Sequence, residues 1–190
     1  MKSKKRLQDM SLEELWQLFP IIIEEHNPLW NEQAAQEIEE LKGILADYSP
    51  IINHIGSTAI SGICAKPIVD LLVETADSCG WEEIVETMET NGYTLMAKSE
   101  KRMSFNKGYT EEGFADKVFH IHFHIKGDND EIIFRDYLRE NPQVAREYAD
   151  LKLSLLSEYR HNRDGYTEAK TDFVKKVVAQ AKQSKSKAPV

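Results

Sequence analysis

Cysteines are scarce in this sequence, and no long apolar stretch occurs. The two cysteines, Cys64 and Cys79, are too few for a disulfide scaffold and form no metal-binding pair, so we expect two reduced thiols. No apolar run approaches the roughly 20 residues that a membrane-spanning helix needs. The start, MKSKKRLQDM, has the charge of a signal peptide, but no apolar segment follows it. These absences predict a cytoplasmic protein that makes no membrane contact.

Positive charge is also scarce. The chain of 190 residues contains 24 Lys and Arg against 32 Asp and Glu, which gives a formal net charge of −8. Binding to DNA or RNA needs a cationic surface that neutralises phosphates, so we expect no nucleic-acid polymer as a partner. The deficit still leaves room for one basic pocket that binds a small anion. A chain of this length fits one domain, which we place at residues 1–182, followed by a frayed tail at residues 183–190.

The order of apolar patterns predicts the fold class. Ser11 and Glu14 have the spacing of a capping box, which begins a helix. Trp30 and Trp81 occupy amphipathic helix positions and are expected in the core. Strands are predicted at residues 20–25, 50–55, 67–73, 101–109 and 117–125, and helices at residues 29–46, 81–92, 131–141, 142–162 and 166–181. The sequence therefore predicts an α+β fold: a mixed, mostly antiparallel sheet flanked by helices, with an all-helical C-terminal third.

A Gly-Ser-Thr corner, Gly56 to Thr58, follows the strand expected at residues 50–55. Glycine permits a sharp turn and a close ligand, and the two hydroxyls lie beside exposed amides, so such a corner could hold a phosphate. Taken alone, the tripeptide indicates only a loop. The corner becomes a candidate site because Asp70 follows it and interrupts the apolar strand IVDLLV. A carboxylate with such neighbours has to be paired, hydrogen-bonded or metal-bound, because burying it alone is costly.

Alternation along FHIHFHI places His120, His122 and His124 on one face of a strand. Alternate residues of a strand lie about 6.5 Å apart, so two imidazoles can converge on one ion and three rarely can. A polar sheet face with solvent-exposed histidines is the alternative. Imidazoles beside a carboxylate suit both metal binding and acid–base chemistry, so we favour a functional role for the His-x-His pair if its strand neighbours Asp70.

The stretch HIGSTAISGICAKPIVDLLV, together with HIHF, FRDYLRENPQVAREYADLK and YTEAK, resembles the GrpB family from about Ile21 to Ala181. A Gly-Ser after one strand and an acid in the next is also the opening signature of the nucleotidyltransferase fold of the DNA-polymerase-β type. The resemblance implies that His120 and His122 are the recurrent pair, that His124 is an addition, and that one of the pair faces Asp70 across the pocket. It implies no particular reaction.

One departure from nucleotidyltransferase enzymes concerns the metal site. Those enzymes carry two acids, one residue apart, on this strand, whereas the second position here is Leu72, which cannot act as the second ligand of a two-metal mechanism. Glu74 shares the face of Asp70 but lies two residues too late, and we expect a solvated strand end there. The metal ligands expected are Asp70, His120 and His122. This donor set favours a transition metal such as Zn²⁺ or Mn²⁺, although Mg²⁺ and a metal-free phosphate site stay open.

Several cationic and aromatic residues could complete a phosphate pocket. Lys66, at the start of the Asp70 strand, either reaches a phosphate at the corner or lies on the surface. Arg135 and Arg139 are four residues apart on a helix; we place Arg135 in the pocket and Arg139 in a surface salt bridge. Tyr166 and Lys170, also four apart, either close the pocket over a ligand or pack on one another.

Two functions follow from this set of residues. The first is an enzyme that transfers a nucleotidyl or phosphoryl group to a small acceptor, with Asp70, His120 and His122 as catalytic and metal-binding residues. The second is a non-catalytic module that binds a nucleotide or phosphometabolite; a metal-dependent phosphoester hydrolase is a third. The partner expected is a small phosphorylated ligand or nucleotide, and the oligomeric state is not predicted. The residues expected to bind its phosphates or base are Gly56, Ser57, Thr58, Lys66, Arg135, Tyr166 and Lys170.

Overall fold

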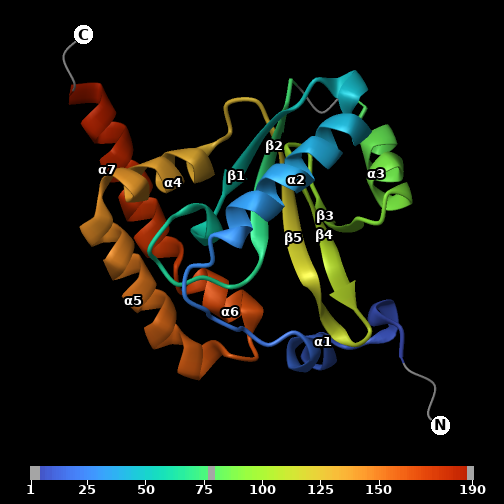
Figure 1. Cartoon of the computed structure of the whole chain (residues 1–190), viewed down its shortest axis with the longest axis horizontal. Helices are drawn as coiled ribbons and strands as arrows, with labels where there is room; N and C mark the ends of the chain where they lie inside the picture. Colours follow the sequence, from blue (N-terminus) through green and yellow to red (C-terminus); the bar gives the residue numbers. More distant parts are fainter. Residues whose placement is uncertain (1–4, 77–79, 188–190) are drawn as a thin grey trace.

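A five-stranded mixed sheet lies at the centre of the computed structural model, which describes residues 5–76 and 80–187 (Figure 1). Its order is β1-β2-β5-β4-β3, and every neighbouring pair is antiparallel except β2 and β5, which are parallel. The strands are β1 (Ile51–Ile55), β2 (Val69–Thr75), β3 (Thr94–Lys98), β4 (Arg102–Thr110) and β5 (Gly113–Ile125). The predicted α+β fold with a mixed, mostly antiparallel sheet is confirmed.

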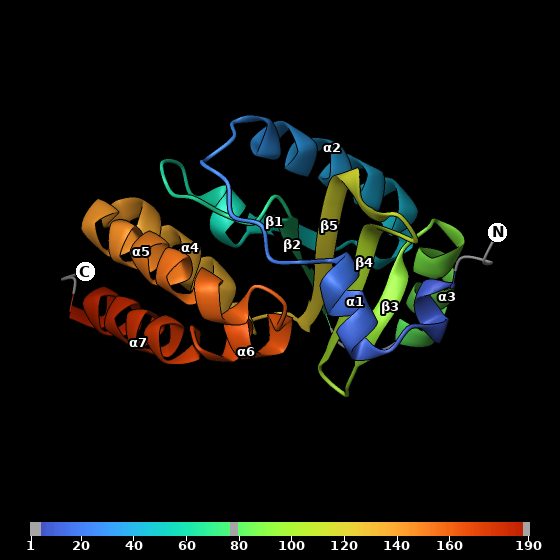
Figure 2. The same ribbon diagram turned by 90° about the horizontal axis from the view of Figure 1, so that it is seen from below.

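Helices pack on the sheet and also form a group of their own. The helices are α1 (Leu12–Leu18), α2 (Leu29–Ile44), α3 (Trp81–Thr90), α4 (Asp130–Glu140), α5 (Pro142–Tyr159), α6 (Arg163–Glu168) and α7 (Thr171–Lys187). Figures 1 and 2 show α2 and α3 lying against the sheet, whereas α4, α5 and α7 gather on the side of β1. The helical C-terminal third is therefore a separate wall beside the sheet.

The larger core lies between the sheet and helices α2 and α3. Alternate residues of the strands point to this side, as the two-residue period of a strand requires. Trp30 and Trp81 are buried here, as predicted. The other buried members include Leu41, Leu45, Val69, Leu71, Val73, Ile84, Met88, Phe105, Phe119, Ile121 and Phe123. Residues of β2 and β5 at the intervening positions point to the opposite face.

A second core joins the C-terminal helices to the segment that follows β1. Its buried members are Ile60, Ile63, Phe134, Leu138, Ala145, Tyr148, Val177 and Val178. Ile60 and Ile63 come from the loop after the Gly-Ser-Thr corner, whereas the others come from α4, α5 and α7. The hydrophobic effect thus fixes the helical wall to the corner, and a space remains between that wall and the sheet.

Two elements differ from the sequence-based prediction. Residues 20–25 form no strand, apart from one bridge in which Glu24 and Ala65 exchange backbone hydrogen bonds. The reason is that Pro20 has no amide to donate and the Ile21 amide donates to Arg160 instead, so no ladder develops. Strand β3 was not predicted, because it is a short edge strand whose side chains are mostly exposed and give little pattern.

The C-terminal helix predicted at residues 166–181 is in fact two helices. Helix α6 begins earlier, at Arg163, after Asn162 accepts a hydrogen bond from the Gly165 amide as a cap. A turn at residues 169 and 170 then separates it from α7, and this turn holds Lys170. Helix α7 extends to Lys187, through part of the segment expected to be frayed.

Two further sequence features can be compared with the structure. Ser11 and Glu14 form the predicted capping box at the start of α1. Cys64 is a free thiol, whereas Cys79 lies outside the described residues. Across the described ranges, the helices are either too short or too polar to cross a bilayer.

Candidate functional site

The strand register places polar side chains in rows on the face of the sheet opposite α2. In the first row, Asp70 on β2 pairs with His120 on β5, which pairs with Asn106 on β4. Two residues further on, His122 is flanked by Leu72 and Ser104. The parallel pairing of β2 and β5 therefore brings together side chains about 50 residues apart. All of these residues except Leu72 line a cavity of about 530 Å³ between the sheet and the helical wall.

Asp70 is the centre of this arrangement. Its Oδ1 lies 3.2 Å from Nε2 of His122 and 3.4 Å from Nδ1 of His120. The three side chains offer ligand atoms that all lie within 4.8 Å of one another. Gly56 approaches from the end of β1 with φ +70°, and a Cβ atom there would lie 2.6 Å from Oδ2 of Asp70. Only glycine allows this contact without displacing the carboxylate.

A chain of hydrogen bonds extends from Asp70 to α6. Arg163 donates to Oη of Tyr109 at 2.7 Å, and the same Oη lies 2.7 Å from Nε2 of His120. A guanidinium can only donate, so the Tyr109 hydroxyl is free to give its own proton to Nε2. Nδ1 of His120 then carries the ring proton and donates to Asp70. Geometry thus selects one tautomer of a neutral His120.

Tyr109 reaches this position because of a β-bulge. The register of β4 against β5 shifts between Lys107 and Tyr109, and Gly108 between them has φ +89°. A Cβ atom at Gly108 would overlap the Lys117 carbonyl oxygen, so the bulge needs glycine. The extra residue turns Tyr109 to the face that carries Asn106. Without it, Tyr109 would point to the other face of the sheet, away from His120.

The hydrogen bonds also set the charge states of Asp70 and His120. Burial disfavours the charged carboxylate, but hydrogen bonds from His120 and His122 outweigh burial and hold the pKa of Asp70 well below its usual range. Burial lowers the pKa of His120 by more than the attraction of Asp70 raises it. The base of the cavity therefore presents an anionic carboxylate beside a neutral imidazole.

The opposite wall of the cavity carries cations. Lys66, Lys152, Lys170 and Arg163 line it, and none of the four forms an ion pair with an acid in the part of the chain that the structure describes. Lys66 and Lys170 lie over the ring of the buried Tyr166, with Nζ 5.8 and 4.3 Å from its centroid. Tyr166 thus packs under both lysine stems, as the sequence allowed.

Burial and mutual repulsion weaken the proton affinity of these lysines. Burial, followed by the charges of Lys66 and Lys152, lowers the pKa of Lys170 to about 7. Burial, followed by Arg163, lowers the pKa of Lys66 to about 8, and burial lowers that of Lys152 to about 8. An anion that entered the cavity would relieve this repulsion.

The Gly-Ser-Thr corner forms one end of the cavity as a short 3₁₀ turn, Ser57–Ala59. The hydrogen bonds of the turn begin with the Ala59 amide, which donates to Gly56, so the turn itself does not use the amides of Ser57 and Thr58. Thr58 is buried, and its hydroxyl lies 2.9 Å from Nε2 of His54. This hydroxyl therefore links the turn to His54 of β1.

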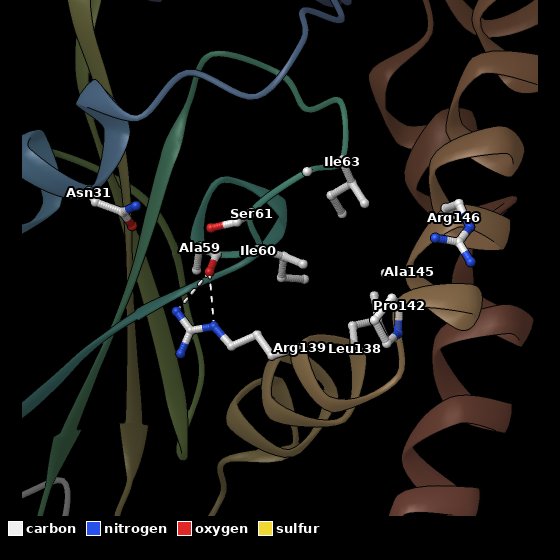
Figure 3. A pocket seen from close by; sticks show the side chains of 11 residues that line it. Asn31, Ala59, Ile60, Ser61, Ile63, Leu138, Arg139, Pro142, Ala145 and Arg146 are labelled. Carbon is white, nitrogen blue, oxygen red and sulfur yellow. Dashed lines mark hydrogen bonds between the residues drawn. The ribbon is translucent and has the colours of Figure 1, made fainter.

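Two arginines of α4 hold this corner from outside. Arg139 donates two hydrogen bonds to the Ala59 carbonyl, at 3.0 and 2.7 Å, as Figure 3 shows. Arg135, one turn earlier, donates to the His54 carbonyl at 2.8 Å and pairs with Asp136 at 2.7 Å. The placement of Arg135 in the pocket is corrected, because its guanidinium is committed to these partners and does not line the cavity.

One expectation for the third row of the sheet, which contains Glu74 and His124, was also wrong. Glu74 is buried rather than solvated, and it accepts hydrogen bonds from the Gly127 amide and the Asn129 side chain. His124, its partner across the parallel pair, is buried and lies 2.7 Å from the Asp128 carbonyl oxygen. This row closes the loop before α4 and lies outside the cavity.

The sequence interpretation missed several residues that line the cavity, and also Tyr109, which bonds to two cavity residues. Ser104 and Asn106 follow the alternation of β4, and they could have been found once β4 was paired with the histidine strand. Tyr109 depends on the bulge, and Arg163 and Lys152 depend on how the C-terminal helices dock. No local pattern in the sequence marks these last three.

Asp70, His120 and His122 fit a transition-metal ion. Two ligands of a tetrahedral zinc ion at 2.0–2.1 Å lie about 3.3 Å apart. The 3.2 and 3.4 Å separations around Asp70 match this value, although a hydrogen-bonded Asp-His pair has similar spacing. Nδ1 of His120 could bind a metal if its proton moved to Nε2, which would then donate to Tyr109. The donor set and its geometry are therefore compatible with one ion.

The fold and the site together define a class: an α+β protein with an Asp-His-His cluster on its sheet, at the base of a cavity with a cationic wall. A family model described as GrpB protein matches residues 20–180. The chain therefore belongs to the GrpB family, as the resemblance predicted.

Relatives of known sequence and structure agree. The chain is 33% identical over 163 residues to the UPF0157 protein YqkA of Bacillus subtilis. This match covers 84% of the chain and 47% of YqkA, so the chain spans about half the length of that relative. It is 32% identical over 164 residues to the glutamate-rich protein GrpB of Alkalihalophilus pseudofirmus, covering 83% and 94% of the two chains. The crystal structure of the conserved protein GrpB from Enterococcus faecalis is similar at 31% identity and a TM-score of 0.75, covering 87% of this chain and all of that one.

Proposed function

We propose that the cavity binds a small phosphorylated ligand, such as a nucleotide, together with one divalent cation, and that the protein transfers a phosphoryl or nucleotidyl group of this ligand to a small acceptor. The observation that carries this proposal is the arrangement of opposite charges: an Asp-His-His cluster on the sheet faces three lysines and an arginine that have no acid partner among the described residues. A bound anion would supply the partner that these four cations lack.

The sheet side would hold the cation. Asp70 supplies the negative charge, and His120 and His122 supply neutral nitrogens, a set that suits Zn²⁺ or Mn²⁺ better than Mg²⁺. The ion would draw charge from the phosphate oxygens and so assist displacement at phosphorus. Tyr109 orients the His120 ring through its hydrogen bond to Nε2.

The helical side and the corner would hold the phosphates. Lys66, Lys170 and Arg163 donate to their oxygens, and the backbone amides of Ser57 and Thr58 lie at the end of the cavity. In the transfer step, the acceptor oxygen bonds to phosphorus while the bond to the leaving oxygen breaks. The cations stabilise the negative charge on that oxygen, and the acceptor proton passes to solvent.

A second candidate function is a binding module without chemistry. Leu72 supports it, because this fully buried residue occupies the position of the second acid and offers no ligand atom. Such a module would bind the same ligand with the same residues. The two functions differ only in turnover.

The test is a thermal-shift screen of nucleotides and phosphometabolites, each with Zn²⁺, Mn²⁺, Mg²⁺ or a chelator, on the wild type and Asp70→Asn. A ligand at a hundred times its dissociation constant adds about 2.7 kcal/mol, which corresponds to a rise of roughly 5–10 °C. We expect a rise that needs both ligand and metal and is lost in Asp70→Asn. Ligands that bind are then followed by phosphorus NMR with candidate acceptors.

The outcomes separate the candidates. Ligand-dependent stabilisation with new phosphorus signals supports the transferase, and stabilisation without turnover supports the binding module. Ser104→Ala serves as the control, because Ser104 lines the cavity but belongs to neither the metal cluster nor the cationic wall. No shift with any combination would falsify both.

A further inference from the structure

Lys170 combines three properties that are rarely found together in a lysine. It lines the cavity, it is partly exposed, and no acid within the described ranges pairs with its ammonium. It lies in the turn between α6 and α7, with Nζ 4.3 Å from the centre of the Tyr166 ring. Reagents that enter the cavity therefore have access to the amine.

Its neighbours favour the neutral form of that amine. Lys66 lies over the same ring, and Lys152 is nearby on α5. Burial and these two charges lower the pKa of Lys170 to about 7, so a large fraction is uncharged near neutral pH, compared with about 0.1% of an ordinary lysine. Desolvation beside other cations is a known way to make a lysine nucleophilic.

The same cations would also concentrate a reagent that carries a phosphate. We propose that Lys170 is a site of covalent self-acylation by acyl phosphates, small molecules that join an acyl group to phosphate. This inference rests on the proposed anion-binding cavity but not on its metal or on group transfer. Phosphate held by Lys66 and Arg163 would bring the acyl carbon to the Lys170 amine.

The chemistry balances without a further reactant. The lone pair of Nζ attacks the acyl carbon, and the bond from that carbon to the phosphate oxygen breaks. Inorganic phosphate leaves with the electron pair, and the amine proton passes to it or to water. The product is an amide on Lys170 plus phosphate. Because the amide is neutral, acylation removes one charge from the wall and weakens later binding of anions.

Lysines elsewhere in the chain provide internal controls. Lys126 and Lys175 are exposed to solvent and lie outside the cavity. Lys152 has a lowered pKa of about 8 but is only 2% exposed, and its ammonium donates to the Cys64 carbonyl. Comparison with Lys152 separates the effect of a low pKa from the effect of access.

The experiment treats the full chain with acetyl phosphate at pH 7.5 in the presence of a chelator and follows each lysine by peptide mass spectrometry. We expect Lys170 to be acetylated at least about tenfold faster than Lys126, Lys175 or Lys152, and excess sulfate to slow Lys170 alone. In Lys66→Gln, with an unchanged melting temperature, the rate at Lys170 should fall severalfold.

A second reagent tests the role of the phosphate. An N-hydroxysuccinimide ester of acetate delivers the same acyl group without phosphate, so the preference for Lys170 over Lys126 should be several times smaller with it. Equal preference with both reagents, or an acetyl phosphate rate at Lys170 no higher than at Lys126, would overturn the proposal. Since metal and nucleotide are absent, failure of the proposed metal site or of the proposed group transfer does not affect this result, whereas failure of anion binding would remove its basis.

Discussion

The two sides of the cavity are built on opposite principles. On the sheet, Asp70, His120 and Tyr109 satisfy one another through hydrogen bonds, and strand register fixes their positions. On the cationic side, Lys66 and Lys170 lie over the ring of Tyr166 without an acid partner among the described residues. The polar groups on the sheet have hydrogen-bond partners without a ligand, whereas the cations opposite them repel one another. A ligand should therefore change the wall more than the sheet.

The largest effect should come from Gly56→Ala, which breaks the sheet side. Its Cβ would lie 2.6 Å from Oδ2 of Asp70, and φ is +70°, so the carboxylate must move. We expect zinc affinity, measured by calorimetry, to fall by more than about tenfold, comparable with losing a partner of a metal ligand. The strained backbone should also cost about 1–2 kcal/mol of folding stability.

The control for that variant is Gly62→Ala. Gly62 has φ +81°, but a Cβ atom there would meet nothing within 4 Å. The control should lose similar stability through the backbone and keep the zinc affinity. Equal loss of zinc affinity in both variants would mean that contact with Asp70 is not what Gly56 provides.

The next effect should come from Lys170→Gln, which changes the wall. Hydrogen bonds to charged groups contribute about 1.5–3 kcal/mol, so affinity for pyrophosphate should drop about tenfold or more. Zinc affinity should be unchanged. The melting temperature of the ligand-free protein should not fall, because the substitution removes an ammonium that has no acid partner among the described residues. Lys175→Gln, an exposed site on α7, should change neither property. A clear loss of zinc affinity in Lys170→Gln would show that the two sides are not independent.

A smaller effect should appear with pH. The pKa values of Lys66, Lys152 and Lys170 are lowered to about 8, 8 and 7, below the usual value for lysine. Sulfate, which stays a dianion, should therefore bind severalfold more weakly at pH 8.5 than at pH 6.5, as these groups lose their protons. Affinity that is constant over this range would contradict the role of the lysines.

The same lowered pKa values affect the stability of the ligand-free protein in the opposite direction, because that stability rises with pH while sulfate affinity falls. Between about pH 7 and 10 the unfolded chain binds more protons at these lysines than the folded chain does, so their contribution to unfolding free energy rises with pH. Lys170→Gln should reduce this rise in denaturant titrations across that range. Saturating sulfate should also reduce this rise in unfolding free energy with pH, because the bound anion favours the protonated lysines.

The smallest effect should come from Arg139→Lys, which weakens the support of the corner. Lysine cannot reproduce the two hydrogen bonds to the Ala59 carbonyl, and the loss should be about 1 kcal/mol because the guanidinium is partly exposed. That corresponds to a lower melting temperature by about 2–4 °C. The control is Arg146→Lys, because Arg146 is exposed and bonds to the Gln143 side chain; this variant should leave the melting temperature unchanged.

Sequence reasoning predicted the elements that carry a strong local pattern. The histidine strand, the strand around Asp70 and the helices of the C-terminal third were found because alternation and helical periodicity are clear there. The meeting of Asp70 with His120 and His122 was anticipated only through the family resemblance. Alternation cannot show that two strands so distant in sequence pair in parallel.

The errors share one physical cause, which is that a side chain's direction depends on tertiary packing. Arg135 was placed in the cavity, but the rotation of α4 points it at the His54 carbonyl. Glu74 was expected in water, but the loop at Gly127 covers it and uses its carboxylate. Tyr109 depends on a single-residue bulge and Arg163 on a helix that starts before its predicted position. These are properties of docking between elements, which a linear pattern does not encode.

The chain order of the two sides has a consequence for biosynthesis. The Asp-His-His cluster lies between residues 70 and 122, whereas Lys152, Arg163 and Lys170 come from the last 40 residues. Because domains emerge and fold from the N-terminus during translation, the strands that bear the cluster leave the ribosome before the helical wall exists. A growing chain thus contains the proposed cation ligands, together with Lys66 and the Gly-Ser-Thr corner, before the cations of the C-terminal helices have been made. Metal supply at that stage is a variable that experiments on the purified protein would not reveal.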